Sequence, residues 1–96
     1  MMVLITYDVE TETSEGRRRL RRVSRQCLNY GQRVQNSVFE CVLDGAQFAE
    51  LRHSISGIID IKKDSVRFYF LGNKWERKVE SIGKETSFNV EGDLII

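Results

Sequence analysis

The chain has 96 residues, of which 41% are hydrophobic and 30% are charged, and its formal net charge is +1. This length predicts a single domain covering residues 1–96, and the near-neutral charge excludes a polycation, although not a local basic patch. The apolar N-terminal stretch is short, lacks a basic leader and runs into acidic residues. We therefore expect neither a signal peptide nor a membrane span, and a cytoplasmic location.

The first third of the chain predicts a strand followed by a helix. Residues 2–9 are rich in β-branched and apolar side chains, which favours a central strand. A polar loop follows, and Ser14 is placed to act as the helix N-cap. Residues 16–30 have apolar side chains three and four positions apart, which predicts an amphipathic helix ending at Gly31. The apolar stripe contains Leu20, Val23, Cys27 and Tyr30.

The middle of the chain predicts one long strand and a second helix. We expect a continuous strand over residues 33–43, with its apolar side chains toward the C-terminal end. Asp44 is placed to cap the next helix, and Gln47, three residues later, completes a capping-box pattern. The apolar stripe of this helix contains Phe48, Leu51, Ile55 and Ile58.

The last third predicts two further strands and an apolar tail. Residues 65–71 alternate between apolar and polar side chains, a turn follows at residues 72–73, and residues 78–82 favour a short strand. The chain ends in three apolar residues, and a lone apolar tail is rarely left in water. We therefore expect residues 84–96 to dock on a partner chain, which predicts a homodimer.

Together these elements predict an α+β fold in two layers, an antiparallel sheet with both helices on one face. The expected order is β-α-β-α-β-β. A bend within residues 33–43 would add a strand, but we do not expect it to restore the β-α-β-β-α-β order of ferredoxin-like domains. The pattern leaves the order of the strands in the sheet open.

Asp8 is the first candidate for chemistry, because a carboxylate follows an uncharged strand at its C-terminal end, where ligand sites often gather. Hard cations such as Mg²⁺ take oxygen ligands, and two copies of Asp8 related by a dimer axis would make a fair site. Such a metal could activate water and neutralise charge on a phosphate. On the sequence alone, a simple strand-ending role for Asp8 is the favoured alternative.

The predicted first helix carries six arginines and no lysine, and most of them lie opposite the apolar stripe. Arginine binds phosphate in a bidentate way that lysine cannot, and a solvated helix face normally mixes charges of both signs. The cluster therefore favours nucleic-acid binding over a merely solvated face. Its members are Arg17, Arg18, Arg19, Arg21, Arg22 and Arg25, and Arg33 extends it.

Other residue types predict no site. His53 falls off the apolar stripe of the second helix and is expected to be solvated. Cys27 and Cys41 have no metal-ligand spacing and are expected to be buried thiols in a reducing compartment. The chain has no glycine-rich phosphate loop, zinc pattern or Ser/His/Asp arrangement.

Several segments, in order along the whole chain, resemble the CRISPR-associated Cas2 family. They are LITYDV around Asp8, GRRRLRR at the start of the first helix, YGQRVQNSVFE at residues 30–40 and RFYFLG at residues 67–72. The third of these is the most specific. RFYFLG and the EGDLI segment near the C-terminus look most like subtype I-C members.

The resemblance implies a ferredoxin-like homodimer whose C-terminal strand packs across the partner's sheet. It also implies a divalent-metal-dependent endonuclease acting on RNA or DNA, in which Asp8 from each chain binds Mg²⁺ or Mn²⁺. The family further bridges integrase dimers during the capture of new spacers. The residues that the resemblance implies in substrate binding are Tyr7, the arginines of the first helix, Arg33, Ser37 and Phe39.

Three hypotheses follow. The protein is a metal-dependent endonuclease with Asp8 as its catalytic carboxylate, or a non-catalytic DNA-binding scaffold for an integrase, in which Asp8 is structural. The third is a regulatory ferredoxin-like dimer that binds no nucleic acid, and the arginine face argues against it.

Overall fold

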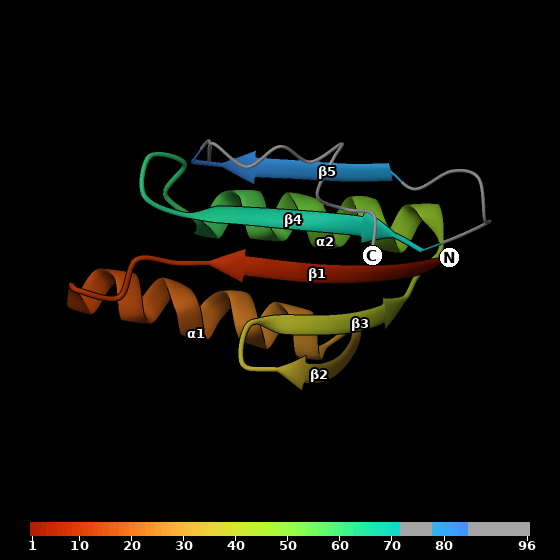
Figure 1. The fold of residues 1–96 in the computed structure, drawn as a ribbon, viewed down its shortest axis with the longest axis horizontal. Coiled ribbons are helices and arrows are strands. Elements are labelled where there is room, and N and C mark those ends of the chain that lie inside the picture. The colour runs from red at the N-terminus through yellow and green to blue at the C-terminus, as the bar shows by residue number, and fades with distance from the viewer. Residues whose placement is uncertain (72–77, 85–96) are drawn as a thin grey trace.

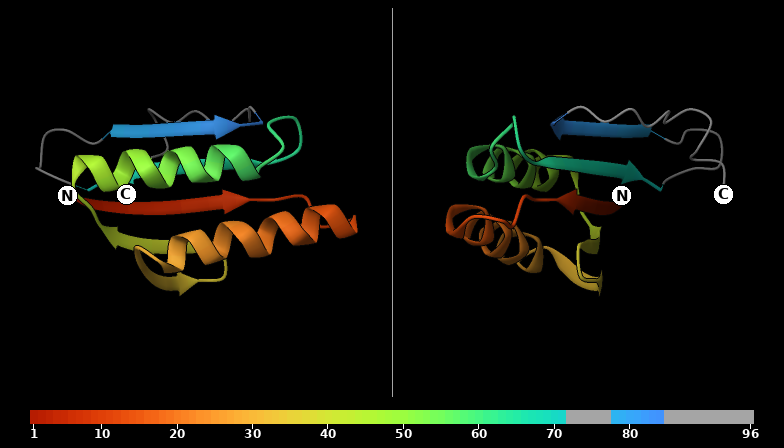
Figure 2. Two further views of the ribbon diagram at one scale, coloured as in Figure 1. Left: turned by 180° about the vertical axis from the view of Figure 1, so that it is seen from behind. Right: turned by 60° about the vertical axis from the view of Figure 1, so that its left-hand side comes forward.

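The fold is a five-stranded antiparallel sheet with two helices on one face, as the computed structural model shows for residues 1–71 and 78–84 (Figure 1). The opposite face of the sheet is not covered by either helix (Figure 2). The elements are β1 (Met2–Asp8), α1 (Ser14–Leu28), β2 (Gly31–Gln35), β3 (Val38–Val42), α2 (Gly45–Ile58), β4 (Ser65–Phe70) and β5 (Lys78–Gly83).

The strand order in the sheet is β2-β3-β1-β4-β5, and every neighbouring pair is antiparallel. β1 therefore lies at the centre of the sheet, between β3 and β4. The first six elements follow the ferredoxin-like order β-α-β-β-α-β, and β5 adds a strand next to β4. The predicted two-layer α+β fold is confirmed.

The prediction of one long strand over residues 33–43 is wrong. This segment is a hairpin, in which β2 and β3 are joined at Asn36 and Ser37. Asparagine and serine favour turns because their side chains bond to the nearby backbone, and the register shifts between Arg33 and Gln35. The extra strand restores the ferredoxin-like order, so the expectation that a bend would not do so is also wrong.

Both helices begin with a side-chain cap. In α2 the predicted capping box is present, because Asp44 accepts from the Gln47 amide at 2.8 Å and Gln47 accepts from the Asp44 amide at 2.9 Å. In α1 the cap is Thr13, which accepts from the amide of Gly16 at 3.0 Å, rather than the predicted Ser14. Serine and threonine are both good caps, so the sequence favours this turn without choosing the residue.

The core lies between the sheet and the helices. On β1, alternate residues (Val3, Ile5 and Tyr7) point into it, as the period of two in a strand requires. The predicted helix stripes supply the other side of the core, with Val23 and Cys27 fully buried on α1. The remaining fully buried apolar residues are Phe39, Cys41, Leu51, Ile55, Val66 and Phe68.

Cys27 and Cys41 are free and buried, as predicted. Burial, the largest effect, raises the pKa of Cys27 to about 12. The predicted turn at residues 72–73 and all but the first residue of the 84–96 tail lie outside the described residues. Among the described helices, none is long and apolar enough to cross a membrane.

Candidate nucleic-acid and metal site

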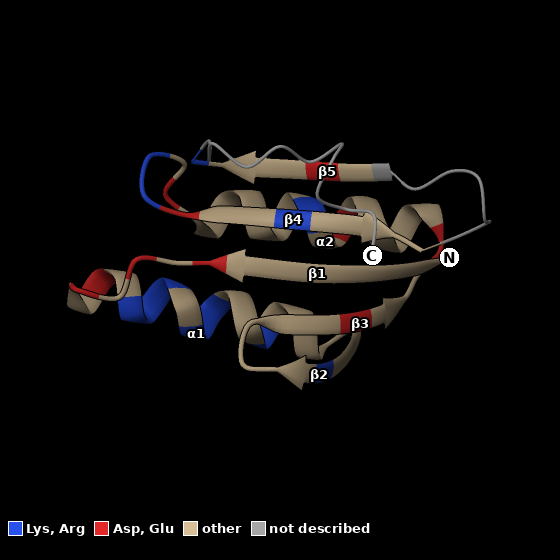
Figure 3. Ribbon diagram, viewed as in Figure 1, with Lys and Arg blue, Asp and Glu red and all other residues tan. Residues whose placement is uncertain are grey.

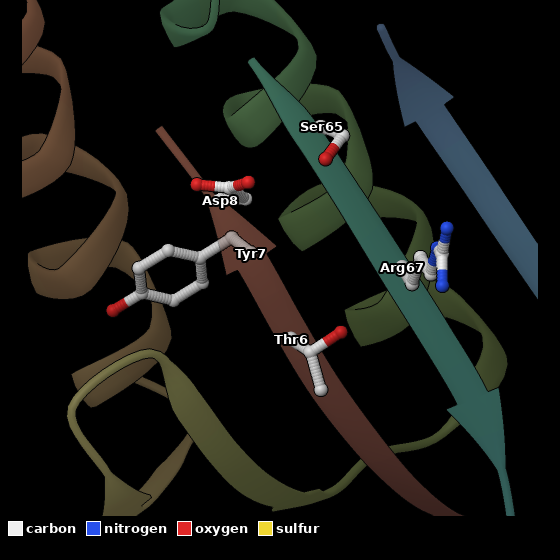
Figure 4. Close-up of a pocket in the computed structure, with 5 residues that line it drawn as sticks. All are labelled: Thr6, Tyr7, Asp8, Ser65 and Arg67. Atoms are coloured by element: carbon white, nitrogen blue, oxygen red, sulfur yellow. The ribbon is translucent and has the colours of Figure 1, made fainter. Parts of the chain in front are cut away.

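Asp8 lies at the end of β1 on the face of the sheet that neither helix covers, which we call the uncovered face. Because Tyr7 points into the core, its neighbours Thr6 and Asp8 point the other way. Asp8 is paired with Ser65 and Thr6 with Arg67 in the register between β1 and β4. These residues and Tyr7 line a hollow of about 210 Å³ (Figure 4).

The hollow contains one carboxylate, hydroxyl oxygens and one guanidinium. Asp8 is its acidic residue, Ser65 and Thr6 carry the hydroxyls, and Arg67 supplies positive charge. Oxygen ligands suit Mg²⁺ or Mn²⁺, and a guanidinium suits a phosphate. Within the described residues, no cluster of three or more acidic, histidine or cysteine side chains is placed to hold a metal. A metal at Asp8 would therefore need further ligands, such as water, substrate or a second copy of the chain.

A buried carboxylate, Asp64, immediately precedes Ser65 and stabilises the segments around the hollow. Asp64 is fully buried. It accepts hydrogen bonds from Arg19 Nε at 2.7 Å, from the Asp60 amide at 2.9 Å and from the Glu10 amide at 3.0 Å. Burial would raise the pKa of Asp64, but the bonds from Arg19 and the two amides outweigh it and hold that pKa below its usual value. Asp64 thus ties three segments together beside Ser65, the β4 partner of Asp8.

The loop between β1 and α1 closes on itself through Glu10. The Glu10 carboxylate accepts from the amides of Glu12 and Thr13 and from the Thr13 hydroxyl. Gly16 is buried against the backbone carbonyl of Glu10, where any side chain would overlap it. This close approach explains why a glycine opens the arginine-rich segment, and it fixes where α1 starts relative to Asp8.

Five of the six helix arginines are exposed, and Figure 3 shows basic residues repeated along α1. Arg19 is the exception. It is 14% exposed and bonds to Asp64, with a second contact of 3.6 Å to Glu10. Its guanidinium is thus engaged within the fold, which argues against the nucleic-acid role predicted for it. We call the exposed set the arginine face, and its members are Arg17, Arg18, Arg21, Arg22 and Arg25.

A groove of about 600 Å³ separates α1 from the β2–β3 hairpin, and we call it the hairpin groove. Arg21 and Arg25 line its α1 wall, and Arg33 lines it from β2. Two leucines and three small polar residues complete the described lining, and none of these residues is acidic. They are Leu20, Leu28, Ser24, Asn36 and Ser37.

Tyr7 and Phe39, predicted to support substrate binding, are both buried. Their rings stack with centroids 6.1 Å apart, and the guanidinium of Arg33 lies 5.1 Å from the centroid of Phe39. The Tyr7 hydroxyl bonds to Ser24 Oγ at 2.7 Å. The Phe39 ring thus lies against the Arg33 guanidinium, and the Tyr7 hydroxyl is bonded to α1.

Sequence reasoning missed Asp64 altogether and did not foresee the hairpin groove. Asp64 and Arg19 are 45 positions apart, and no local pattern pairs them. The only sequence feature that pointed to Asp64 was its position immediately before a predicted strand. The groove depends on the hairpin, which was predicted as a single strand.

Comparison with known proteins agrees with this fold and with the quoted motifs. The model of the family described as CRISPR associated protein Cas2 matches residues 1–79. The chain belongs to the Cas2 family. The CRISPR-associated endoribonuclease Cas2 of Chlorobaculum tepidum is 55% identical, over all of both chains. The CRISPR-associated endonuclease Cas2 of Halalkalibacterium halodurans is 53% identical, over 99% of each chain.

Solved structures support the same family fold. The crystal structure of Streptococcus pyogenes Cas2 is similar with a TM-score of 0.72 and 60% identity, over 78% of this chain and 90% of that one. A hypothetical protein from Thermus thermophilus is similar with a TM-score of 0.67 and 29% identity, over 78% and 85% of the two chains. The ferredoxin-like fold of this chain is therefore that of the Cas2 family.

Proposed function

We propose that this protein is a divalent-metal-dependent endonuclease that hydrolyses phosphodiester bonds in nucleic acid, with Asp8 as the metal-binding carboxylate. The supporting observation is that Asp8 lies exposed in a hollow shared with Ser65 and Arg67. The names of two relatives, an endoribonuclease and an endonuclease, favour the same reaction class. A bound Mg²⁺ or Mn²⁺ would lower the pKa of a water molecule and neutralise charge on the phosphate.

The chain's own residues would share the work in the hollow. Asp8 would hold the metal, and Arg67, which lines the same hollow, would meet a phosphate oxygen. The arginine face supplies sequence-independent attraction to the phosphate backbone. Serine and threonine hydroxyls at Ser65 and Thr6 can donate hydrogen bonds to phosphate oxygens.

We propose further that the protein acts as a homodimer through the uncovered face of the sheet. One chain supplies one carboxylate to the hollow, so a second Asp8 would complete a better metal site. The uncovered face carries apolar side chains, including Val42, which is 71% exposed. A sheet face of this kind needs a cover, and we propose that the partner chain and the 84–96 tail provide it.

The test is the pair Asp8→Ala and Glu12→Ala, assayed with Mg²⁺ or Mn²⁺ on single-stranded RNA and on duplex DNA. Both changes remove one exposed carboxylate, but only Asp8 lines the hollow. Cleavage should be lost in Asp8→Ala and kept in Glu12→Ala, while both variants should still bind nucleic acid in EDTA. Persistent cleavage by purified Asp8→Ala protein would place the active site elsewhere.

A second candidate function is a scaffold that binds DNA and bridges integrase dimers during adaptation. It is favoured because α1, which carries the arginine face, lies on one side of the sheet (Figure 1), whereas the Asp8 hollow lies on the other. Binding on α1 would then not require Asp8. If Asp8→Ala still supports spacer capture with the integrase partner, cleavage is dispensable and the scaffold function stands.

A further inference from the structure

We propose that the hairpin groove binds a nucleic-acid strand at an unpaired nucleotide, with its phosphate held between Arg21, Arg25 and Arg33 and its base on Leu20 and Leu28. This inference rests on the nucleic-acid binding proposed above and narrows its substrate class to strands with accessible bases. It does not depend on metal or on cleavage.

The positive charge of the groove favours the binding of an anion. Arg21 and Arg25 are four residues apart on α1 and so lie on the same flank of the helix, and Arg33 faces them from β2. In the described part of the chain, neither Arg21 nor Arg25 has an acidic partner, and no described lining residue is acidic. Three guanidiniums from two elements are well suited to grip one phosphodiester.

The groove is held in shape by the core beneath it. Ser24, in the α1 wall, bonds to the Tyr7 hydroxyl, which also donates to the Asn36 carbonyl in the hairpin at 3.5 Å. The Tyr7 ring stacks on Phe39, and Phe39 lies under the Arg33 guanidinium. Both walls are therefore anchored to the same buried rings, so ordering the site costs little entropy on binding.

The leucines decide which kind of nucleic acid fits. Leu28 is 54% exposed, and Leu20, two turns earlier on the same flank, is half-buried. A duplex covers its base faces by stacking and offers a helix flank mainly sugar and phosphate. An unpaired base has a free face that can lie on apolar side chains. A groove of about 600 Å³ has room for one nucleotide with neighbouring backbone.

The test compares two pairs of arginines on the same helix. Arg21→Gln with Arg25→Gln removes two charges from the groove, whereas Arg18→Gln with Arg22→Gln removes two from the outer face. Binding of a mixed-sequence single-stranded 20-mer is measured by fluorescence anisotropy in EDTA, with Asp8→Ala in every protein so that nothing is cleaved. The groove pair should lose roughly tenfold more affinity than the outer pair, and its salt slope should fall by about 0.7 for each phosphate that the variant no longer neutralises.

A second comparison tests the base. Leu28→Ser should weaken binding of the normal single strand by roughly fivefold or more, and should leave binding of an abasic strand and of a blunt duplex unchanged. Circular dichroism and melting temperature confirm that each variant is folded, which is expected because Leu28 and the four arginines are exposed.

Equal losses from the two arginine pairs would overturn the inference, as would a Leu28→Ser protein that binds the normal strand unchanged. It would also be overturned if Leu28→Ser weakened binding of the duplex as much as binding of the single strand. Because binding is measured without metal, a failure of the nuclease proposal leaves this result readable. If the protein cleaves nucleic acid but the groove variants bind it as tightly as the wild type does, this inference is refuted and the nuclease proposal stands.

Discussion

Arg19 Nε lies 2.7 Å from Asp64 Oδ2, and this ion pair joins the first turns of α1 to the residue preceding β4. Asp64 is followed directly by Ser65, which is the strand partner of Asp8. The same carboxylate accepts from the amide of Glu10, two residues beyond Asp8. The buried Asp64 carboxylate thus fixes the relative positions of β1 and β4, which form the hollow, and of α1, which carries the arginine face.

Removing the Asp64 carboxylate should destabilise the fold. Asp64→Ala leaves the Arg19 guanidinium and two backbone amides without their acceptor, and breaking a buried ion pair from one side costs about 3–5 kcal/mol. We expect the free energy of unfolding in urea to fall by that amount. Glu12→Gln is the control, because the Glu12 carboxylate is exposed and has no partner among the described residues, so its effect should stay within about 0.5 kcal/mol. A loss for Asp64→Ala as small as that of the control would contradict the supporting role of Asp64.

The same residue predicts an acid dependence of stability. The pKa of Asp64 is lower in the folded chain than its ordinary value, so the folded state binds fewer protons there than the unfolded state. Its stabilisation is therefore present above the ordinary Asp pKa of about 3.9 and is lost as the pH falls through the lower folded value. Glu10, whose pKa is also lowered, acts in the same direction.

This acid dependence is measured as the free energy of unfolding between pH 7 and pH 2. The wild-type curve should fall below about pH 4, and the curve of Asp64→Asn should fall less over the same interval. Parallel curves for the two proteins would show that Asp64 does not contribute to the acid transition.

Replacing a glycine with alanine should lower stability at Gly16 and raise it at Gly57. At Gly16 a methyl group would overlap the backbone carbonyl of Glu10, so Gly16→Ala should destabilise the fold by about 1–3 kcal/mol. At Gly57, near the end of α2, nothing lies within 4 Å of the added methyl. Gly57→Ala should therefore stabilise the helix by about 0.5–1 kcal/mol. A Gly16→Ala protein that melts at or above the wild-type temperature would contradict the close packing at Gly16, and a Gly57→Ala protein that melts lower would contradict the open space at Gly57.

The two thiols should be unreactive in the folded protein. Both are buried, and burial raises the pKa of Cys27 to about 12, so almost no thiolate is present near pH 8. We expect a thiol reagent such as 5,5′-dithiobis(2-nitrobenzoate) to titrate neither group before unfolding and both in guanidinium chloride. Rapid titration of one group in the native protein would show that its site opens without global unfolding.

Local patterns in the sequence predicted much of this protein. The run of β-branched and apolar residues placed Asp8 at the end of a central strand, the three- and four-residue spacing placed Val23 and Cys27 in the core, and the capping box placed the start of α2. These features depend on neighbours within a few positions, so a reading along the chain can find them. The hairpin within residues 33–43 was missed because its two strands are short and its turn has no glycine.

The sequence by itself determined the two-layer class, the carboxylate at the end of the first strand and a helix rich in arginine, because each follows from periodicity or composition within one segment. Only the tertiary structure decided that Arg19 forms an ion pair with Asp64 and that the Arg33 guanidinium lies over the Phe39 ring. It also decided that Arg21 and Arg25 face the hairpin across a groove. Those pairings join residues far apart in the chain. They arise only once the layers have packed, because packing brings distant segments side by side and a buried charge such as Asp64 must then find a partner.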